Sequence, residues 1–401
     1  MFKGKYYKIL FLFLLLITFL FGKFQGGFIN WFLFYSVAVL WTYLWLTAKF
    51  SLRNIKVSRN LSKNRLTAGD DLEVMVEIFN RFWFPHIYLI VEDDKPVKLK
   101  GKIFRTKHLL YPWFRSKTKI DYKITGTLRG VHKWEYIDLM TGDIFGIIQI
   151  KKRIPIFSEA VIYPRSYPVL TWKTENKRNI GMIFSQSKLS EETASVIGVR
   201  EYRKGDRFNR IHWKQSAKVM QLMTKEFERQ ITNDFLFFLN QESNMYVNNE
   251  HFEKAVELTA SLFRYAESKR FPAGLVSYGK YQRSVPLARD KEQMLRLFEV
   301  LALAEPDSQF SFTDAVFNDL SSIALGTTVV LISTKLDDNL FTLLGQLSFK
   351  KFKVEVFIVN YGDTPQYYND NIFSNDNNIS FYLIPVNYID SSNEKGGITI
   401  A

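Results

Sequence analysis

The sequence predicts a membrane-anchored α+β multidomain protein with a two-helix transmembrane hairpin, a β-sandwich-like domain and an α/β doubly wound domain. Three observations predict this order. Two apolar runs open the chain, and apolar and polar residues then alternate with a period of two. After residue 230, strand and helix patterns alternate. We expect domain boundaries at 1–50, 51–165, 166–229 and 230–401.

The apolar runs cover residues 6–22 and 28–48, and the second contains no charged residue. Its 21 residues are enough to span the hydrocarbon core. A secretory signal peptide is the alternative for the first run, but no small-residue cleavage site follows it. Many Lys and Arg residues flank the two runs, whereas the connecting loop holds only Lys23. The positive-inside rule therefore predicts a multi-pass cell-membrane protein with two spans and both termini in the cytoplasm.

Charge is distributed unevenly along the chain. Residues 1–229 hold 40 Lys and Arg against 19 Asp and Glu, whereas the whole chain carries +14. This excess predicts an anionic neighbour, either lipid headgroups or nucleic acid. Because the apolar runs already indicate a lipid bilayer, we expect no nucleic-acid partner. The chain has no cysteine, which excludes disulfides and thiolate metal sites.

The region 51–165 has the pattern of strands with one buried face. In the segment DLEVMVEIFN, four apolar residues alternate with polar ones: Leu72, Val74, Val76 and Ile78. Several such short runs, separated by Gly, Pro, Asp and Asn, predict a β-sandwich of about 100 residues. We interpret it as a spacer near the membrane, and a carbohydrate- or peptide-binding role is the alternative.

The region 230–401 begins with the near-continuous apolar run NDFLFFLN, which is typical of a buried parallel strand. Ligands of open α/β sheets bind at the carboxyl ends of the strands. The residues there are NQESN (240–244) and STK (333–335), and neither segment is a glycine-rich phosphate loop. Scattered histidines and the missing H-E-x-x-H pattern also argue against a metal site. We expect no cofactor.

Residues 199–218, VREYRKGDRFNRIHWKQSAK, combine seven Arg and Lys residues with an acid, a His and a Trp. Asp206 is expected to cap a helix, with Arg210 within ion-pair reach. Trp213 and Ile211 are expected to pack against a sheet. Trp213 shares a helical face with Met220.

Three interpretations of this motif remain open. The cations are solvated on a structural helix, or they form a docking surface for acidic groups, or Asp206 and His212 serve a hydrolase. The candidate docking residues are Arg200, Tyr202, Arg203, Lys204, Gly205, Asp206, Arg207, Arg210, His212, Trp213 and Lys214.

The same motif resembles the central motif of a bacterial family of unassigned function, domain of unknown function fifty-eight. The pattern R-x-Y-x-x-G-D-x-x-R-R-I-H/N-W-K-x-S/T-A matches from Arg200 to Ala217, with Asn209 at a usually basic position. RGVHKWEYIDLMTGDIFGI (129–147) resembles the family's R-G … D-P-F-G element, with Ile144 in place of Pro. VIYPR (161–165) resembles a third element.

The resemblance implies a von Willebrand factor A-like C-terminal domain and a MoxR-type AAA+ ATPase as partner. Metal-binding relatives of that domain carry D-x-S-x-S after the first strand, and Asn240, Glu242 and Asn244 stand there in this chain. Lys335 adds a cation, so we expect the metal site to be lost. The predicted function is a membrane-anchored cytoplasmic interaction or scaffold protein, not an enzyme, that acts with the ATPase on cell-envelope proteins. The alternative is a hydrolase using the Asp206–His212 region.

Overall fold

The computed structural model divides into two units, residues 1–165 and 166–401. It is a mixed α/β structure with several sheets. The described residues are 6–53, 55–80, 87–94, 96, 102–103, 107–113, 116–172, 196–203, 206, 208–227, 234–280, 282–320, 323–324, 326–360, 378–387, 389 and 397–400.

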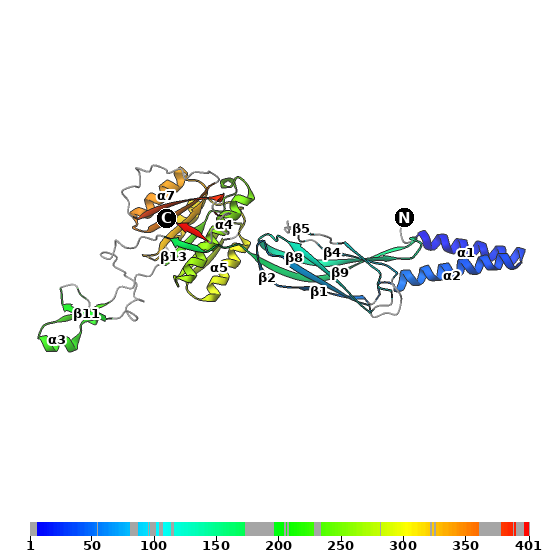
Figure 1. Ribbon diagram of the computed structural model, residues 1–401, viewed down its shortest axis with the longest axis horizontal. Coiled ribbons are helices and arrows are strands. Elements are labelled where there is room, and N and C mark those ends of the chain that lie inside the picture. Colours follow the sequence, from blue (N-terminus) through cyan, green and yellow to red (C-terminus); the bar gives the residue numbers. More distant parts are fainter. Residues whose placement is uncertain are drawn as a thin grey trace. The chain divides into compact units, whose positions relative to one another are not determined.

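Two apolar helices, α1 (Tyr6–Gln25) and α2 (Phe28–Phe50), begin the first unit and run side by side (Figure 1). Gly26 and Gly27, both with positive φ, make the turn between them. Among the described residues only α2 is long and apolar enough to cross a membrane, and the apolar part described for α1, residues 9–25, is shorter.

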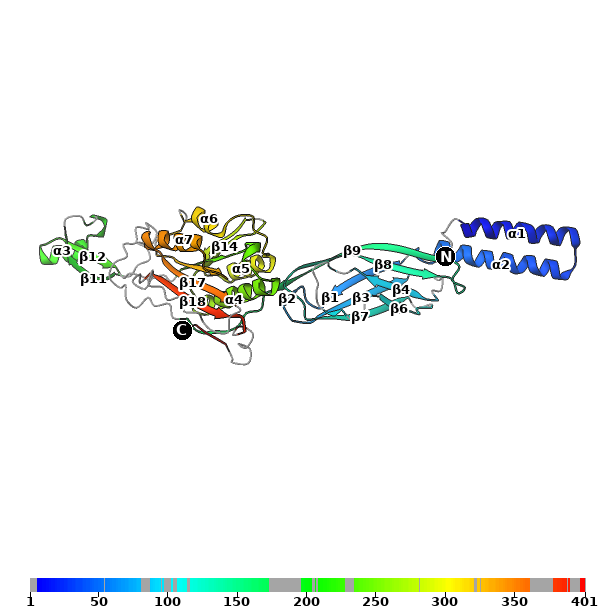
Figure 2. The same cartoon turned by 90° about the horizontal axis from the view of Figure 1, so that it is seen from above.

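The β-rich region consists of two sheets. One has the order β1-β3-β7-β5 and the other β2-β9-β8-β4-β6, and nearly all pairs are antiparallel. Figure 2 labels most of these strands. Their bounds are β1 Ile55–Leu61, β2 Arg65–Thr67, β3 Leu72–Asn80, β4 Leu89–Asp93, β5 Lys102–Ile103, β6 Lys107–Leu110, β7 Lys117–Thr125, β8 Gly130–Gly142 and β9 Gln149–Tyr163.

The two sheets share one core. The alternating apolar side chains of β3 are buried, as the period of two predicts, and they cluster with Trp134 and Ile137 of β8. A polar group also lies inside this core. Arg59 is one of the cations that follow the second apolar run and would be expected at the surface, but its guanidinium is buried and paired with Asp93. Burial therefore removes Arg59 from the surface charge available to lipid.

The second unit contains a six-stranded sheet with the order β15-β14-β13-β16-β17-β18. All neighbouring pairs are parallel except β14 with β15. β15 is not evident from the sequence because Pro286 interrupts its pattern. The bounds are β13 Phe235–Leu239, β14 Ala273–Tyr278, β15 Gln282–Ala288, β16 Thr328–Ser333, β17 Lys353–Asn360 and β18 Ile379–Pro385.

Helices pack on both faces of this sheet, and β13 shows how. Phe235 and Phe237 point into a core with α4 and α5, whereas Leu236 and Phe238 point into a second core with α6 and α7. Burial on both faces explains why the strand is apolar throughout. The helices, labelled in Figure 2, are α4 Asn249–Ser268, α5 Lys291–Leu303, α6 Phe312–Asp319 and α7 Asp338–Phe349.

The second unit begins before the predicted boundary at residue 230. β10 (Val169–Trp172) pairs in parallel with β19 (Ile398–Ile400). Trp172 is buried against Phe235 and Phe357. Residues 166–172 therefore belong to the α/β core and are not linker. The basic motif lies between β10 and β13, so it is inserted into this domain along the chain.

Candidate functional site

The basic motif folds into a small hairpin with one helix. β11 (Val196–Glu201) pairs antiparallel with β12 (Met223–Phe227), and the connection contains the 3-10 turn η1 (Phe208–Arg210) and helix α3 (Trp213–Val219). The candidate docking residues Lys204, Gly205 and Arg207 lie outside the described residues.

Asp206 was predicted to cap a helix, but it does not. Its carboxylate instead accepts hydrogen bonds that hold the start of this connection in place. Arg200 Nη1 and Nη2 donate to its two carboxylate oxygens at 2.8 Å each, a bidentate pair. The backbone N–H of Arg203 and the hydroxyl of Thr224 also donate to it. The Arg200 guanidinium, with the Arg203 amide, lowers the pKa of Asp206 to about 2. The predicted pairing with Arg210 stays a prediction.

His212 takes the capping role that the sequence assigned to Asp206. It is the N-cap of α3, and its Nδ1 accepts from the backbone N–H of Gln215 at 3.2 Å. The prediction failed because η1 delays the start of the helix until after His212. Ser216 then fixes the helix to β12, since its hydroxyl accepts from Met223 N at 2.8 Å and donates to the His212 carbonyl.

Ile211 and Trp213 were both expected to be buried, and only one is. Ile211 is 3% exposed, and a β-bridge joins it to Thr224. Trp213 is 65% exposed, so its predicted packing role is wrong. The motif buries its aliphatic residue and presents its largest aromatic residue on the surface.

The exposed side of α3 carries an apolar face with cations beside it. Trp213, Ala217 and Met220 follow helical spacing and are all exposed, Met220 at 93%. Lys214 and Lys218 are exposed on the same short helix. We call these five residues the α3 face. The spacing of Trp213 and Met220 was visible in the sequence, but spacing alone does not distinguish a buried face from an exposed one.

One exposed aromatic residue of the motif was not among the candidate docking residues. Phe208 is 68% exposed and stacks on Tyr202, with ring centroids 6.0 Å apart. It occupies a variable position of the motif pattern, so the pattern gave no signal for it. Arg203, which is one of the candidate docking residues, is also exposed. The hairpin thus presents aromatic and cationic side chains together.

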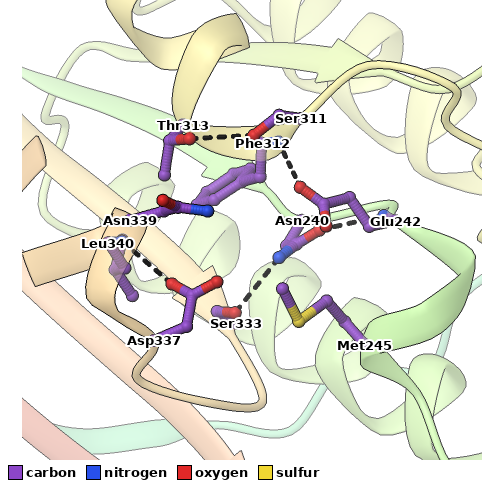
Figure 3. Close-up of a pocket in the computed structure, with 10 residues that line it drawn as sticks. All are labelled: Asn240, Glu242, Met245, Ser311, Phe312, Thr313, Ser333, Asp337, Asn339 and Leu340. Carbon is purple, nitrogen blue, oxygen red and sulfur yellow. Dashed lines mark hydrogen bonds between the residues drawn. The ribbon is translucent and has the colours of Figure 1, made fainter.

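A second candidate site lies where β13 and β16 end, at the point where the order of the sheet reverses. A small pocket opens there, and Figure 3 shows the side chains. Asn240 Nδ2 donates to Ser333 Oγ at 3.2 Å, and Asn240 Oδ1 accepts from the backbone of Glu242. The lining residues are Asn240, Glu242, Met245, Ser311, Phe312, Thr313, Ser333, Asp337, Asn339 and Leu340.

The two carboxylates of this pocket already serve the backbone. Asp337 caps α7 by accepting from Leu340 N at 2.9 Å, and Glu242 accepts from Phe312 N at the start of α6. Asn244 is exposed and does not line the pocket. Within the described ranges no group of three or more His, Cys, Asp or Glu side chains could hold a metal ion. The donor set therefore gives a metal ion no carboxylate cluster to bind.

Comparison with known proteins supports the family resemblance. A family model described as protein of unknown function DUF58 matches residues 198–364. The uncharacterized protein YeaD of Bacillus subtilis (strain 168) is 31% identical over 295 residues, which cover 73% of each chain.

Two solved structures show remote likenesses. The CARDB domain of the PF1109 protein from Pyrococcus furiosus is 9% identical, with a TM-score of 0.20 over 27% of this chain and 92% of that one. MyfA of the Myf fimbriae of Yersinia enterocolitica is 8% identical, with a TM-score of 0.19 over 26% and 98%. These values carry no argument about fold or function. The relation to YeaD and the family match across the basic motif do carry one, and the chain belongs to the DUF58 family of proteins of unknown function.

Proposed function

We propose that this protein is a membrane-anchored cytoplasmic interaction protein that uses the α3 face to dock an acidic protein partner. The observation that carries the proposal is the exposure of Trp213 on α3, whereas Ile211 just before the helix and Ser216 within it are buried. Trp and Arg are enriched at the energetic centres of protein interfaces, and exposed apolar residues ringed by charge mark such surfaces.

The membrane anchor is supported by α2 and the charges around it. At its cytoplasmic end, Lys49 lies over the rings of Trp45 and Phe50, and Arg53 also lies over Phe50. Aromatic rings with cations are the side chains that anchor a span at the interface. We propose that α1 is the second span, so that both termini and both globular units lie in the cytoplasm.

The proposed partner is a MoxR-type AAA+ ATPase, acting with this protein on cell-envelope proteins. The family resemblance supports the ATPase, and the charge of the α3 face supports an acidic contact surface. The α/β unit, which we infer to be von Willebrand factor A-like, would then carry the docking hairpin as an insertion. Its pocket does not favour metal-dependent binding, because Asp337 and Glu242 are engaged by backbone amides.

The geometry does not favour the alternative hydrolase. A general base and its orienting carboxylate need a shared hydrogen bond. Here Arg200 and the Arg203 amide engage Asp206, while His212 Nδ1 accepts from the helix backbone.

The proposal is tested by binding between the full-length protein in lipid nanodiscs and a purified MoxR-type ATPase from the same organism. Trp213→Ala should weaken binding by about 2 kcal/mol if Trp213 anchors the contact. Lys214→Glu with Lys218→Glu should weaken it severalfold, and the loss should shrink as salt rises.

Lys291→Glu is the matched control, since Lys291 is an exposed lysine at the start of α5, outside the motif. An equal loss of binding in this control would show a general effect of charge, and the motif would then not be the docking surface. Unchanged binding in all motif variants would refute the α3 face as the docking surface. Binding that is absent even in the unaltered protein would refute the ATPase as the partner.

A further inference from the structure

The turn between β8 and β9, residues 143–148, has a rigid frame with an apolar tip. The Asp143 carboxylate is buried and accepts from the backbone N–H groups of Phe145, Ile147 and Ile148, at 2.8, 3.3 and 2.5 Å. Gly146 takes a positive φ within the turn. This bracket fixes the backbone, yet the two side chains at the tip, Ile144 and Phe145, are 66% and 64% exposed.

The exposed apolar side chains at the tip of the turn do not stabilise this domain, because they do not enter its core. Ile148 of the same turn is buried, but in a small cluster with Leu44 of α2 and not in the core of the sandwich. The hydrogen bonds to Asp143 order the backbone of the turn, so local disorder does not explain the exposure of Ile144 and Phe145. Such residues indicate a surface that another apolar medium covers.

The turn lies against the apolar helix α2. The ring of Phe145 meets that of Tyr43 edge-on at 6.5 Å, and the N–H of Ile144 donates to the Tyr43 hydroxyl at 3.3 Å. Leu44 and Ile148 form a small buried cluster beside them. These contacts tie the tip of the turn to a defined level of α2.

If α2 spans the membrane, the contact between the turn and α2 lies deeper in the bilayer than the membrane–water interface. Lys49 marks the cytoplasmic interface, and Tyr43 lies six residues before it. At 1.5 Å per residue, the contact is about 9 Å deeper along the helix than Lys49. Interfacial protein segments bury their apolar face about 5–10 Å into the boundary between headgroups and acyl chains. The turn therefore reaches the depth at which lipid can cover Ile144 and Phe145.

We propose that the turn 143–148 inserts its apolar tip into the cytoplasmic leaflet beside α2, so that the sandwich has a second attachment to the membrane. Lys152 reinforces the same end of the domain by donating to the Leu52 carbonyl at 2.8 Å, just after the helix. The partner is the lipid bilayer itself. The inference rests on the proposed membrane anchor, because it takes its depth from α2.

The chain contains no cysteine, so single-cysteine variants report one position each. Three full-length variants in nanodiscs of phosphatidylethanolamine and phosphatidylglycerol would carry one fluorophore each: Phe145→Cys at the tip, Val39→Cys within α2, and Leu128→Cys. Leu128 is the matched control, an exposed apolar turn residue beyond the other end of β8. The length of β8 places it roughly 40 Å along the strand from the tip. Nitroxide-labelled lipids quench only fluorophores in contact with the bilayer.

We expect quenching at 145 to approach that at 39 and to exceed that at 128 severalfold. An Ile144→Cys variant should repeat the result at 145, which guards against a local effect of one substitution. Quenching at 39 but not at 144 or 145 would refute the inserted turn and leave the anchor intact. Equal quenching at 128 and 145 would refute a specific insertion, since the whole sandwich would then lie on the bilayer. No quenching at 39 would refute the anchor and the inserted turn together.

Discussion

Two arginine–aspartate pairs in this molecule place the same chemistry in opposite surroundings. Arg59 and Asp93 lie inside the sandwich, with side chains 0% and 2% exposed. Arg200 and Asp206 lie in the motif hairpin, with side chains 39% and 18% exposed. This difference in exposure means that the first pair is part of a domain core, whereas the second pair fixes the backbone of a surface hairpin.

The buried pair is fully hydrogen-bonded, as a charge inside a core must be. Arg59 also donates to the carbonyls of Ile156 and Tyr136, and the Tyr122 hydroxyl donates to Asp93 at 2.6 Å. Burial and the Asp93 charge raise the pKa of Tyr122 far above its usual value, so it remains a donor. The network joins strands of both sheets.

The largest expected effect is therefore in the sandwich. Asp93→Ala leaves the Arg59 guanidinium buried without its counter-charge and should cost about 3–5 kcal/mol of unfolding free energy. Such a loss is a large share of a total stability of about 5–15 kcal/mol. Tyr122→Phe is the matched control, because it removes one hydrogen bond to a charged group and should cost only about 1.5–3 kcal/mol. Denaturant unfolding of both variants measures the difference, and equal costs would mean that the charge pair adds nothing beyond the Tyr122 bond.

Periodicity predicted much of the fold because burial follows period directly. The alternation of Leu72 to Ile78 predicted a strand with one buried face, and the unbroken run of β13 predicted a strand covered on both faces. The pairing of β10 with β19 could not be predicted, since a few residues of short apolar sequence carry no information about a partner more than two hundred residues away. The burial of Arg59 was hidden for a similar reason, because its acidic partner is on another strand.

The exposed pair should respond to pH in a narrow window. Because folding lowers the pKa of Asp206 from 3.8 to about 2, the Arg200 pair stabilises the hairpin fully above about pH 4. That contribution should be lost as pH falls from about 4 towards 2, where the folded carboxylate takes up its proton. Hydrogen exchange of the hairpin amides should therefore be faster in Asp206→Asn than in the unaltered protein at pH 6, and the two should converge near pH 2.

The sandwich provides the contrast for this measurement. Its amides should exchange equally in both proteins at each pH, because in the described part of the chain the side chain of Asp206 accepts hydrogen bonds from the motif residues Arg200, Arg203 and Thr224. A global change in exchange would mean that the Asp206 pair supports a larger unit than the hairpin. Equal exchange in the hairpin at pH 6 would mean that the pair does not hold it.

Sequence reasoning predicted a candidate site in the basic motif, but the structure gives several residues of this motif other roles than those predicted. Asp is a preferred N-cap residue and His is not, so propensity favoured Asp206, whereas the actual cap is decided by where η1 ends and α3 begins. Helical spacing put Trp213 and Met220 on one face, yet an amphipathic face shows only that something should cover it. The sequence does not say whether the cover is a sheet of the same chain or a partner.

The smallest expected effect on stability, and the sharpest for function, belongs to Trp213. Truncating a buried Trp typically costs about 3–5 kcal/mol, which Trp134→Ala in the sandwich should show. Trp213 is 65% exposed, so Trp213→Ala should change the unfolding free energy by no more than about 0.5 kcal/mol. Denaturant unfolding of the full-length protein measures both variants. A cost for Trp213→Ala near that of Trp134→Ala would mean that the α3 face packs within the chain and is not free to dock. A small cost together with lost ATPase binding would show that the largest aromatic residue of the motif serves a partner and not the fold.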